Sequence, residues 1–195
     1  MRKAVISFAV GAFVLASAFH LYAASLAGVS MPDTIQAGSA RLVLNGMGVR
    51  TKFMMRVYVA GLYLAQKSSD PDAILKAEAP KRMVMHFVRD ASKSEMADAF
   101  DKWFTNNAPD ARKTMKTDID RLLEALESVE DGDEMVFTYL PGTGMTFAIN
   151  GKEKLIVPGP AFARLIFSVW LGPKPPNADL KKGLLGLSKL SSTED

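Results

Sequence analysis

The order of hydrophobic patterns along the chain is the feature that most constrains its fold. Strand-like segments fill residues 34–88, a helix-like block follows over 92–131, and strand-like segments return over 134–157. Helical spacing resumes from residue 161. Strands and helices in separate blocks are typical of α+β folds with an antiparallel sheet, whereas strict alternation would indicate a parallel sheet. The sequence therefore predicts an α+β fold with helices on one face of an antiparallel sheet.

Six segments have the composition of β-strands, with many β-branched and aromatic residues. They are residues 34–44 (broken, or a hairpin, at Gly38), 52–64, 81–88, 134–140, 145–149 and 154–157. Residues 52–64 (KFMMRVYVAGLYL) are too apolar to face water, so they are expected to form a central strand kinked at Gly61. The sequence NGMG at 45–48 predicts a turn before that strand, and Asn150-Gly151 predicts a type I′ hairpin turn.

The helical block begins with a recognisable start signal. Ser92 and Glu95 have the spacing of a capping box, in which each side chain bonds the backbone N–H of the other residue. The apolar residues that follow recur at helical spacing: Met96, Phe100, Trp103 and Phe104. The sequence NNAP at 106–109 is expected to end this helix. Three further helices are expected over 115–126, 161–171 and 179–187.

The N-terminus has the composition of a secretory signal peptide. A basic start (MRK) precedes an apolar run over 4–19, which is short for a membrane-spanning helix, and small residues follow it. Cleavage is expected after Ala18 or between residues 23 and 27. The chain is therefore divided into a signal peptide (1–27), a folded domain (28–187) and a polar tail (188–195). If the apolar run extends to Val29, the segment would instead be an uncleaved inner-membrane anchor, with the domain facing the periplasm.

Charge and residue content exclude several classes of site. Without the leader, the net charge falls from +3 to about +1, so no nucleic-acid partner is expected, and contact with a membrane is expected only through the leader. The chain has no cysteine, which excludes disulfides, thiolate zinc sites and a cysteine nucleophile. With His20 in the leader, only His86 remains, so no metal or other cofactor is expected. An exported, cysteine-free, nearly neutral chain indicates a periplasmic protein.

Arg50, Arg56 and Tyr58 are the first candidates for a binding site. In a regular strand they share one face, because side chains alternate with a period of two. A guanidinium can grip a carboxylate or phenolate with two hydrogen bonds, a phenol adds a third donor, and apolar neighbours can hold a hydrocarbon body. Alternatively, Arg50 pairs with a surface acid and Tyr58 is an ordinary core aromatic.

Three segments resemble the chalcone isomerase-like superfamily, and more narrowly its bacterial exported members. They are GMGVRTKFMMRVYVAGLYL (46–64), KRMVMHFVRDASKSEM (81–96) and FSVWLGPKPPNADLKKGLLG (167–186). The resemblance covers roughly residues 30–187. It implies an open-faced β-sandwich, with a large antiparallel sheet against a layer of helices and a ligand cleft between them. The superfamily includes plant isomerases that cyclise chalcones, fatty-acid-binding members, and members with no known catalysis.

The resemblance also implies roles for single residues. The family arginine, which holds a phenolate in the enzymes and a carboxylate in the fatty-acid binders, matches Arg50, and the threonine or tyrosine of the next strand matches Tyr58. The catalytic tyrosine and asparagine of the plant enzymes fall near Met96 and Trp103, and their specificity-setting threonine falls near Val169. Met96, Trp103 and Val169 are possible pocket-lining residues, but they cannot order a water or polarise a ketone.

We therefore expect a non-catalytic binder of an apolar carboxylate, such as a fatty acid or an aromatic acid. One alternative is an intramolecular lyase of the chalcone isomerase type, which would need Thr51, Thr143 or Ser168 to lie near Arg50. Another is an envelope interaction module without a small ligand, which would have a collapsed cleft and an exposed apolar patch.

Overall fold

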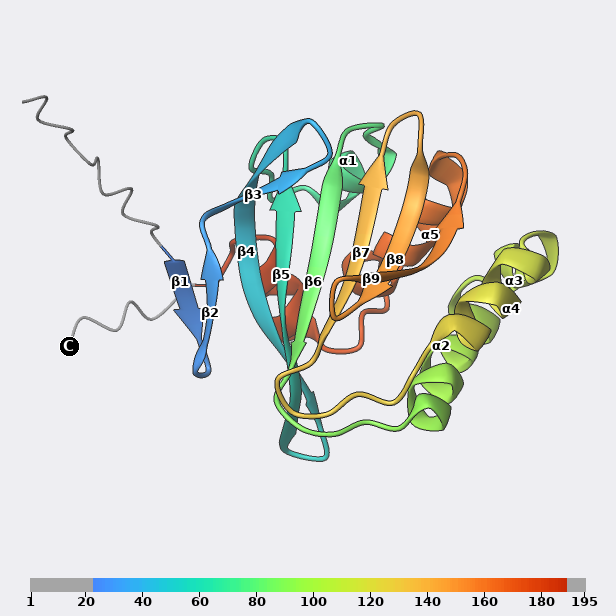
Figure 1. Ribbon diagram of the computed structural model, residues 1–195, viewed down its shortest axis with the longest axis horizontal. Helices are drawn as coiled ribbons and strands as arrows, with labels where there is room; N and C mark the ends of the chain where they lie inside the picture. Colours follow the sequence, from blue (N-terminus) through green and yellow to red (C-terminus); the bar gives the residue numbers. More distant parts are fainter. Residues whose placement is uncertain (1–22, 189–195) are drawn as a thin grey trace, which may run out of the picture.

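A seven-stranded antiparallel sheet dominates the computed structural model, which describes residues 23–188 (Figure 1). Its strands lie side by side in chain order: β3 (Thr34–Ala37), β4 (Ala40–Lys52), β5 (Met55–Leu64), β6 (Lys81–Phe87), β7 (Glu134–Leu140), β8 (Gly144–Ile149) and β9 (Lys152–Val157). A separate two-stranded ribbon is made by β1 (Ala23–Leu26) and β2 (Val29–Pro32). The predicted α+β class and open-faced antiparallel sheet are confirmed.

The helices cover mainly one face of this sheet. They are α1 (Pro71–Lys76), α2 (Lys93–Asn107), α3 (Pro109–Thr114), α4 (Lys116–Ala125), α5 (Pro160–Leu171) and α6 (Ala178–Leu184). Their apolar residues and those of β5–β9 form one large core. A smaller core lies on the opposite face, where the β1–β2 ribbon covers part of β4 and β5. In Figure 1, α5 lies behind the sheet, whereas α2, α3 and α4 form an arm at its side.

The turn predicted at residues 45–48 is wrong, because β4 runs straight through them. The chain turns instead at Phe53 and Met54. The single strand expected over 52–64 is therefore divided: Lys52 is the last residue of β4, and β5 begins at Met55. The glycines serve a different purpose. A Cβ atom at Gly46 would overlap the carbonyl oxygen of Gly183, because α6 lies directly against β4.

Other local signals lead to the expected structure. Ser92 and Glu95 form the predicted capping box, and Asn150-Gly151 joins β8 to β9 with positive φ at both residues. The sequence analysis missed the ribbon, α1 and α3. Residues 23–26, assigned to the leader, pair with β2 as β1. The predicted cleavage after Ala18 lies outside the described residues, and it stays a prediction.

Gly46→Ala is expected to destabilise the fold by about 2–3 kcal/mol, because the added methyl group must push α6 away from β4. Urea unfolding measures the loss. Gly142→Ala is the control. Gly142 has open space around it, so the added methyl group meets no other atom, and the variant only bears the strain of alanine at a positive φ, about 1 kcal/mol. Equal losses in both variants would show that the α6–β4 contact is unimportant.

Candidate ligand-binding site

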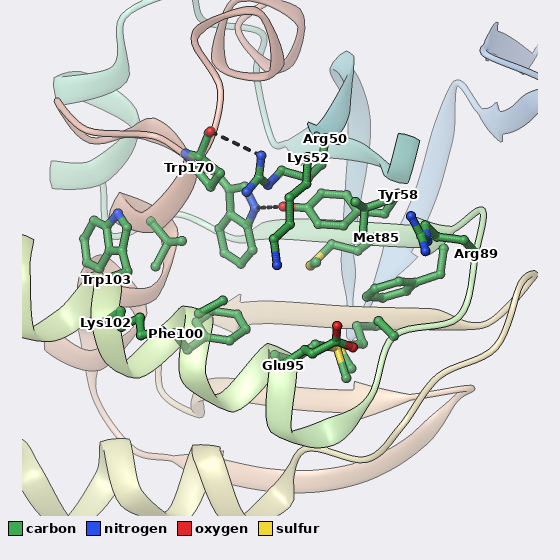
Figure 2. A pocket seen from close by; sticks show the side chains of 18 of the residues that line it. Arg50, Lys52, Tyr58, Met85, Arg89, Glu95, Phe100, Lys102, Trp103 and Trp170 are labelled. Carbon is green, nitrogen blue, oxygen red and sulfur yellow. Dashed lines mark hydrogen bonds between the residues drawn. The ribbon is translucent and has the colours of Figure 1, made fainter. Parts of the chain in front are cut away.

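A cavity of about 510 Å³ lies between α2, strands β4–β6 and the end of α5 (Figure 2). Its walls are mostly apolar, and those walls include Met85, Phe87, Met96, Phe100, Met135 and Trp170. The charged residues of its lining are Arg50, Lys52, Arg89, Lys102, Asp90 and Glu95. The volume is within the range of small-molecule sites, which are commonly apolar with a few polar groups. Basic side chains outnumber acidic ones, so the lining favours an anionic ligand.

Arg50 and Tyr58 lie directly opposite each other on neighbouring antiparallel strands, β4 and β5. Paired residues in such strands point to the same face of the sheet, and both line the cavity. From the sequence, the two residues were expected to share a face along a single strand. The structure brings them together through a hairpin instead, because the turn lies between them.

Tyr58 is buried and bonded to α5. The indole Nε1–H of Trp170 donates a hydrogen bond of 2.9 Å to the Tyr58 hydroxyl oxygen. Burial raises the pKa of Tyr58 to about 12, against the opposing effects of this hydrogen bond and of the Arg50 charge. Tyr58 is therefore a neutral phenol at ordinary pH. Its O–H has no acceptor within residues 23–188, so it remains available to a ligand.

Arg50 is held by the segment that leads into α6. One guanidinium nitrogen, Nη1, donates to Asn177 Oδ1 at 2.8 Å, to the carbonyl oxygen of Pro176 at 3.3 Å and to that of Thr51. Asn177 Oδ1 also accepts from the backbone N–H of Thr51 at 3.0 Å. In the described part of the chain Arg50 pairs with no acid, and its Nε and Nη2 make no hydrogen bond. The structure thus orients the guanidinium and leaves two of its nitrogens for an anion.

The other predicted residues divide into two groups. Met96, Trp103 and Val169 line the cavity, as the resemblance implied. Arg56 does not. It is exposed near the end of the hairpin, and the register shift between Arg50 and Thr51 separates it from the Arg50–Tyr58 pair. The period-two argument assumed a regular strand, and the bulge breaks that regularity.

Several lining residues were missed by the sequence analysis. Lys102 belongs to the same helix as Met96 and Trp103, so the helical period gave a usable signal for it. Lys52 was placed in a strand, and Arg89 follows β6 in a loop, where no pattern marks it. Hydrogen bonds from Ser92 lower the pKa of Glu95, and the charges of Lys52 and Arg89 add to this effect.

The polar groups needed for the lyase alternative do not meet at Arg50. Thr51 and Thr143 are exposed and outside the cavity lining. Ser168 faces a different hollow and donates to the carbonyl oxygen of Leu165 at 2.6 Å. Trp103 Nε1 donates to the carbonyl oxygen of Lys174 at 2.9 Å, so this indole has no free donor.

Residues 23–188 contain no cluster of three or more histidine, cysteine or acidic side chains that could hold a metal ion. No helix in this part of the chain has the length and apolarity to cross a membrane.

Comparison with known proteins decides the family. The chalcone isomerase-like family model matches residues 23–186, which is most of the chain. The chain belongs to the chalcone isomerase-like family. The fold is similar to the crystal structure of a fatty-acid binding protein from Arabidopsis thaliana, with a TM-score of 0.63 and 16% sequence identity over 81% of this chain and 92% of that one. No curated protein matches the sequence.

The raised pKa of Tyr58 predicts a loss of stability in alkali. In the unfolded chain the phenol ionises near pH 10, whereas in the fold it stays protonated up to about pH 12. The unfolded state therefore binds fewer protons at this group, and the contribution of Tyr58 to stability falls by about 3 kcal/mol as pH rises from 10 to 12.

Urea unfolding at several pH values measures this slope. Tyr58→Phe is expected to reduce it, although the variant is less stable at neutral pH because the Trp170 N–H loses its acceptor. An unchanged slope in Tyr58→Phe would show that the group is not buried as described.

Proposed function

We propose that this chain binds an apolar carboxylate, such as a fatty acid, without transforming it. The observation that carries the proposal is the Arg50–Tyr58 pair in the wall of a mostly apolar cavity. Charge-assisted hydrogen bonds from a guanidinium are strong and directional, and they match the two oxygens of a carboxylate. The neutral Tyr58 hydroxyl can donate a third hydrogen bond.

The apolar wall suits a flexible hydrocarbon chain. Met85, Met96 and Met135 have unbranched, adaptable side chains, and Phe100 and Trp170 add broad apolar surfaces. The volume of about 510 Å³ is large enough for a drug-sized or acyl ligand. The Arabidopsis thaliana protein of similar fold is a fatty-acid binding protein, which supports the same ligand class here.

Two alternatives receive less support. A lyase would need polar side chains around the reacting carbonyl, and Thr51, Thr143 and Ser168 lie outside this cavity. An interaction module without a small ligand would combine a collapsed cleft with an exposed apolar patch. Here the cavity is open, and the exposed apolar groups at Phe53 and Met54 lie beside it.

We further propose that the chain is exported to the periplasm, on the basis of its signal-like N-terminus. The predicted signal segment lies almost entirely outside the described residues. Fractionation of cells that express the chain, with N-terminal sequencing of the product, tests this location. Recovery from the cytoplasm with an intact N-terminus would contradict it.

Fatty-acid titration followed by tryptophan fluorescence tests the binding proposal. Both tryptophans of the chain, Trp103 and Trp170, line the cavity, so the signal reports its occupation directly. Replacing Arg50 with Gln is expected to weaken binding of a long-chain fatty acid by about 10- to 100-fold, because charged hydrogen bonds are lost. Arg56→Gln is the matched control, since Arg56 is exposed and outside the cavity.

Two further comparisons separate the alternatives. The fatty alcohol of equal length should bind the unaltered chain more weakly than the acid, because it lacks the charge that Arg50 recognises. A chalcone added at high protein concentration should show no change in its absorbance spectrum over time. No fatty-acid uptake, or equal binding by the Arg50 and Arg56 variants, would overturn the proposal.

A further inference from the structure

The tip of the β4–β5 hairpin exposes three consecutive large apolar side chains. Phe53 is 84% exposed, Met54 is 100% exposed and Met55 is 49% exposed. Within residues 23–188, Ile156 and Leu187 are the only other large apolar side chains that are exposed, and neither lies near this run in sequence. In Figure 1 this hairpin projects beyond the lower end of the sheet. The apolar groups are therefore concentrated on one convex projection.

Turn chemistry does not account for these residues. Lys52 pairs with Met55, so Phe53 and Met54 form a two-residue turn, with φ of 50° and 63°. Such turns favour Asn-Gly, because positive φ strains other side chains. The same chain uses Asn150-Gly151 in the β8–β9 turn, with φ of 49° and 73°. Phe-Met at an equivalent turn leaves a strained backbone and two apolar groups in water.

Basic side chains surround the apolar tip. Residues 50–56 (RTKFMMR) carry three positive charges and no negative one. Lys52 Nζ lies 5.8 Å from the centre of the Phe53 ring, and Arg89 Nη1 lies 3.0 Å from the sulfur of Met55. Basic side chains behind an apolar tip complement an anionic lipid bilayer, in which the phosphates lie above the hydrocarbon.

We propose that this hairpin tip docks on an anionic phospholipid surface. Phe53 and Met54 insert into the boundary between headgroups and acyl chains, and Lys52, Arg56 and Arg89 contact the phosphates. A lipid surface fits better than a folded protein partner, because a stable protein interface buries about 800 Å² on each side, which a two-residue projection does not offer. The proposal departs from the sequence-based expectation that only the N-terminal segment meets a membrane.

Docking at this point would place the cavity next to the lipid. Lys52, Phe53 and Met55 belong both to the tip and to the lining of the cavity. The two acids in the lining have oxygens that are already engaged: Glu95 accepts hydrogen bonds in its capping box, and Asp90 accepts one from the backbone N–H of Asp131. Exchange of a fatty acid between membrane and cavity rests on the proposed function, whereas docking itself does not.

The cysteine-free sequence allows a local probe of insertion. Thr51→Cys places a polarity-sensitive fluorophore beside the tip and leaves Phe53 and Met54 in place. Thr143→Cys is the matched control, an exposed threonine in the turn between β7 and β8 at the opposite end of the sheet. The full chain is mixed with vesicles of phosphatidylcholine alone, or with one quarter phosphatidylglycerol, and without fatty acid.

With the anionic vesicles only, we expect the emission of the probe at position 51 to shift to the blue and to be quenched by spin-labelled lipid. The emission of the probe at position 143 should not change. Anchoring by the N-terminal apolar segment alone would leave the probe at 51 in water, and that result would overturn the proposal. Equal responses at 51 and 143, or no response at either, would overturn it too. Because no fatty acid is present, none of these results depends on the proposed ligand.

Two sets of variants separate docking from folding, each assayed with the probe at position 51. Phe53→Asn with Met54→Gly installs the favoured turn sequence, so it should raise the melting temperature while reducing vesicle affinity about tenfold or more. Lys52→Gln with Arg56→Gln should reduce the affinity roughly 25-fold, since each basic residue near a lipid surface contributes about fivefold. Lys67→Gln with Lys113→Gln, which removes two exposed charges elsewhere, is the control. Unchanged vesicle affinity in both tip variants would refute the docking surface.

Discussion

The packing of α6 against β4 determines the position of the guanidinium on which the proposed site depends. Gly46, Gly48 and Gly183 lack side chains where the two backbones meet, and a Cβ atom at any of them would collide with the opposite backbone. Asn45 ties the same elements together, because its amide donates to the carbonyl oxygen of Leu184 at 2.8 Å. This close contact brings Asn177, just before α6, to Arg50. A helix held further away would leave Arg50 free to extend into solvent.

The environment of Tyr58 complements that of Arg50. Arg50 is fixed by neutral oxygens, so no acid in the described structure competes with a ligand for it. Tyr58 is kept neutral by burial and is oriented by the Trp170 indole, which leaves the phenol proton as a donor. The pair therefore offers a guanidinium and one neutral donor, a combination that favours binding of an anion over acid–base chemistry.

Much of this architecture was predictable, because the spacing at which apolar residues recur indicates which face of a helix or strand is buried. Helix α2 was located from the spacing of Met96, Phe100 and Phe104, and the strands from their content of β-branched residues. The α+β class and the layer of helices followed from these assignments. The failures come from contacts between residues far apart in the sequence. The sequence at 45–48 is a strong turn signal, but its glycines are needed for contact with a helix more than 130 residues away, and no local pattern reveals such a partner. Arg89 was missed for the same reason, since its place beside the cavity depends on the tertiary fold.

Two departures from ideal local structure lie around the opening of the cavity. At Phe53 and Met54 the chain accepts positive φ and exposed apolar groups, although Asn150 and Gly151 show that a favourable turn was accessible to it. Nearby, aromatic and thioether side chains line an open space instead of packing to full density. Both features cost stability, and both lie beside Arg50 and Lys52. Under the two proposals, these costs fall where the protein would meet a ligand or a lipid surface, at the end of the hairpin and not across the sheet or the helix layer as a whole.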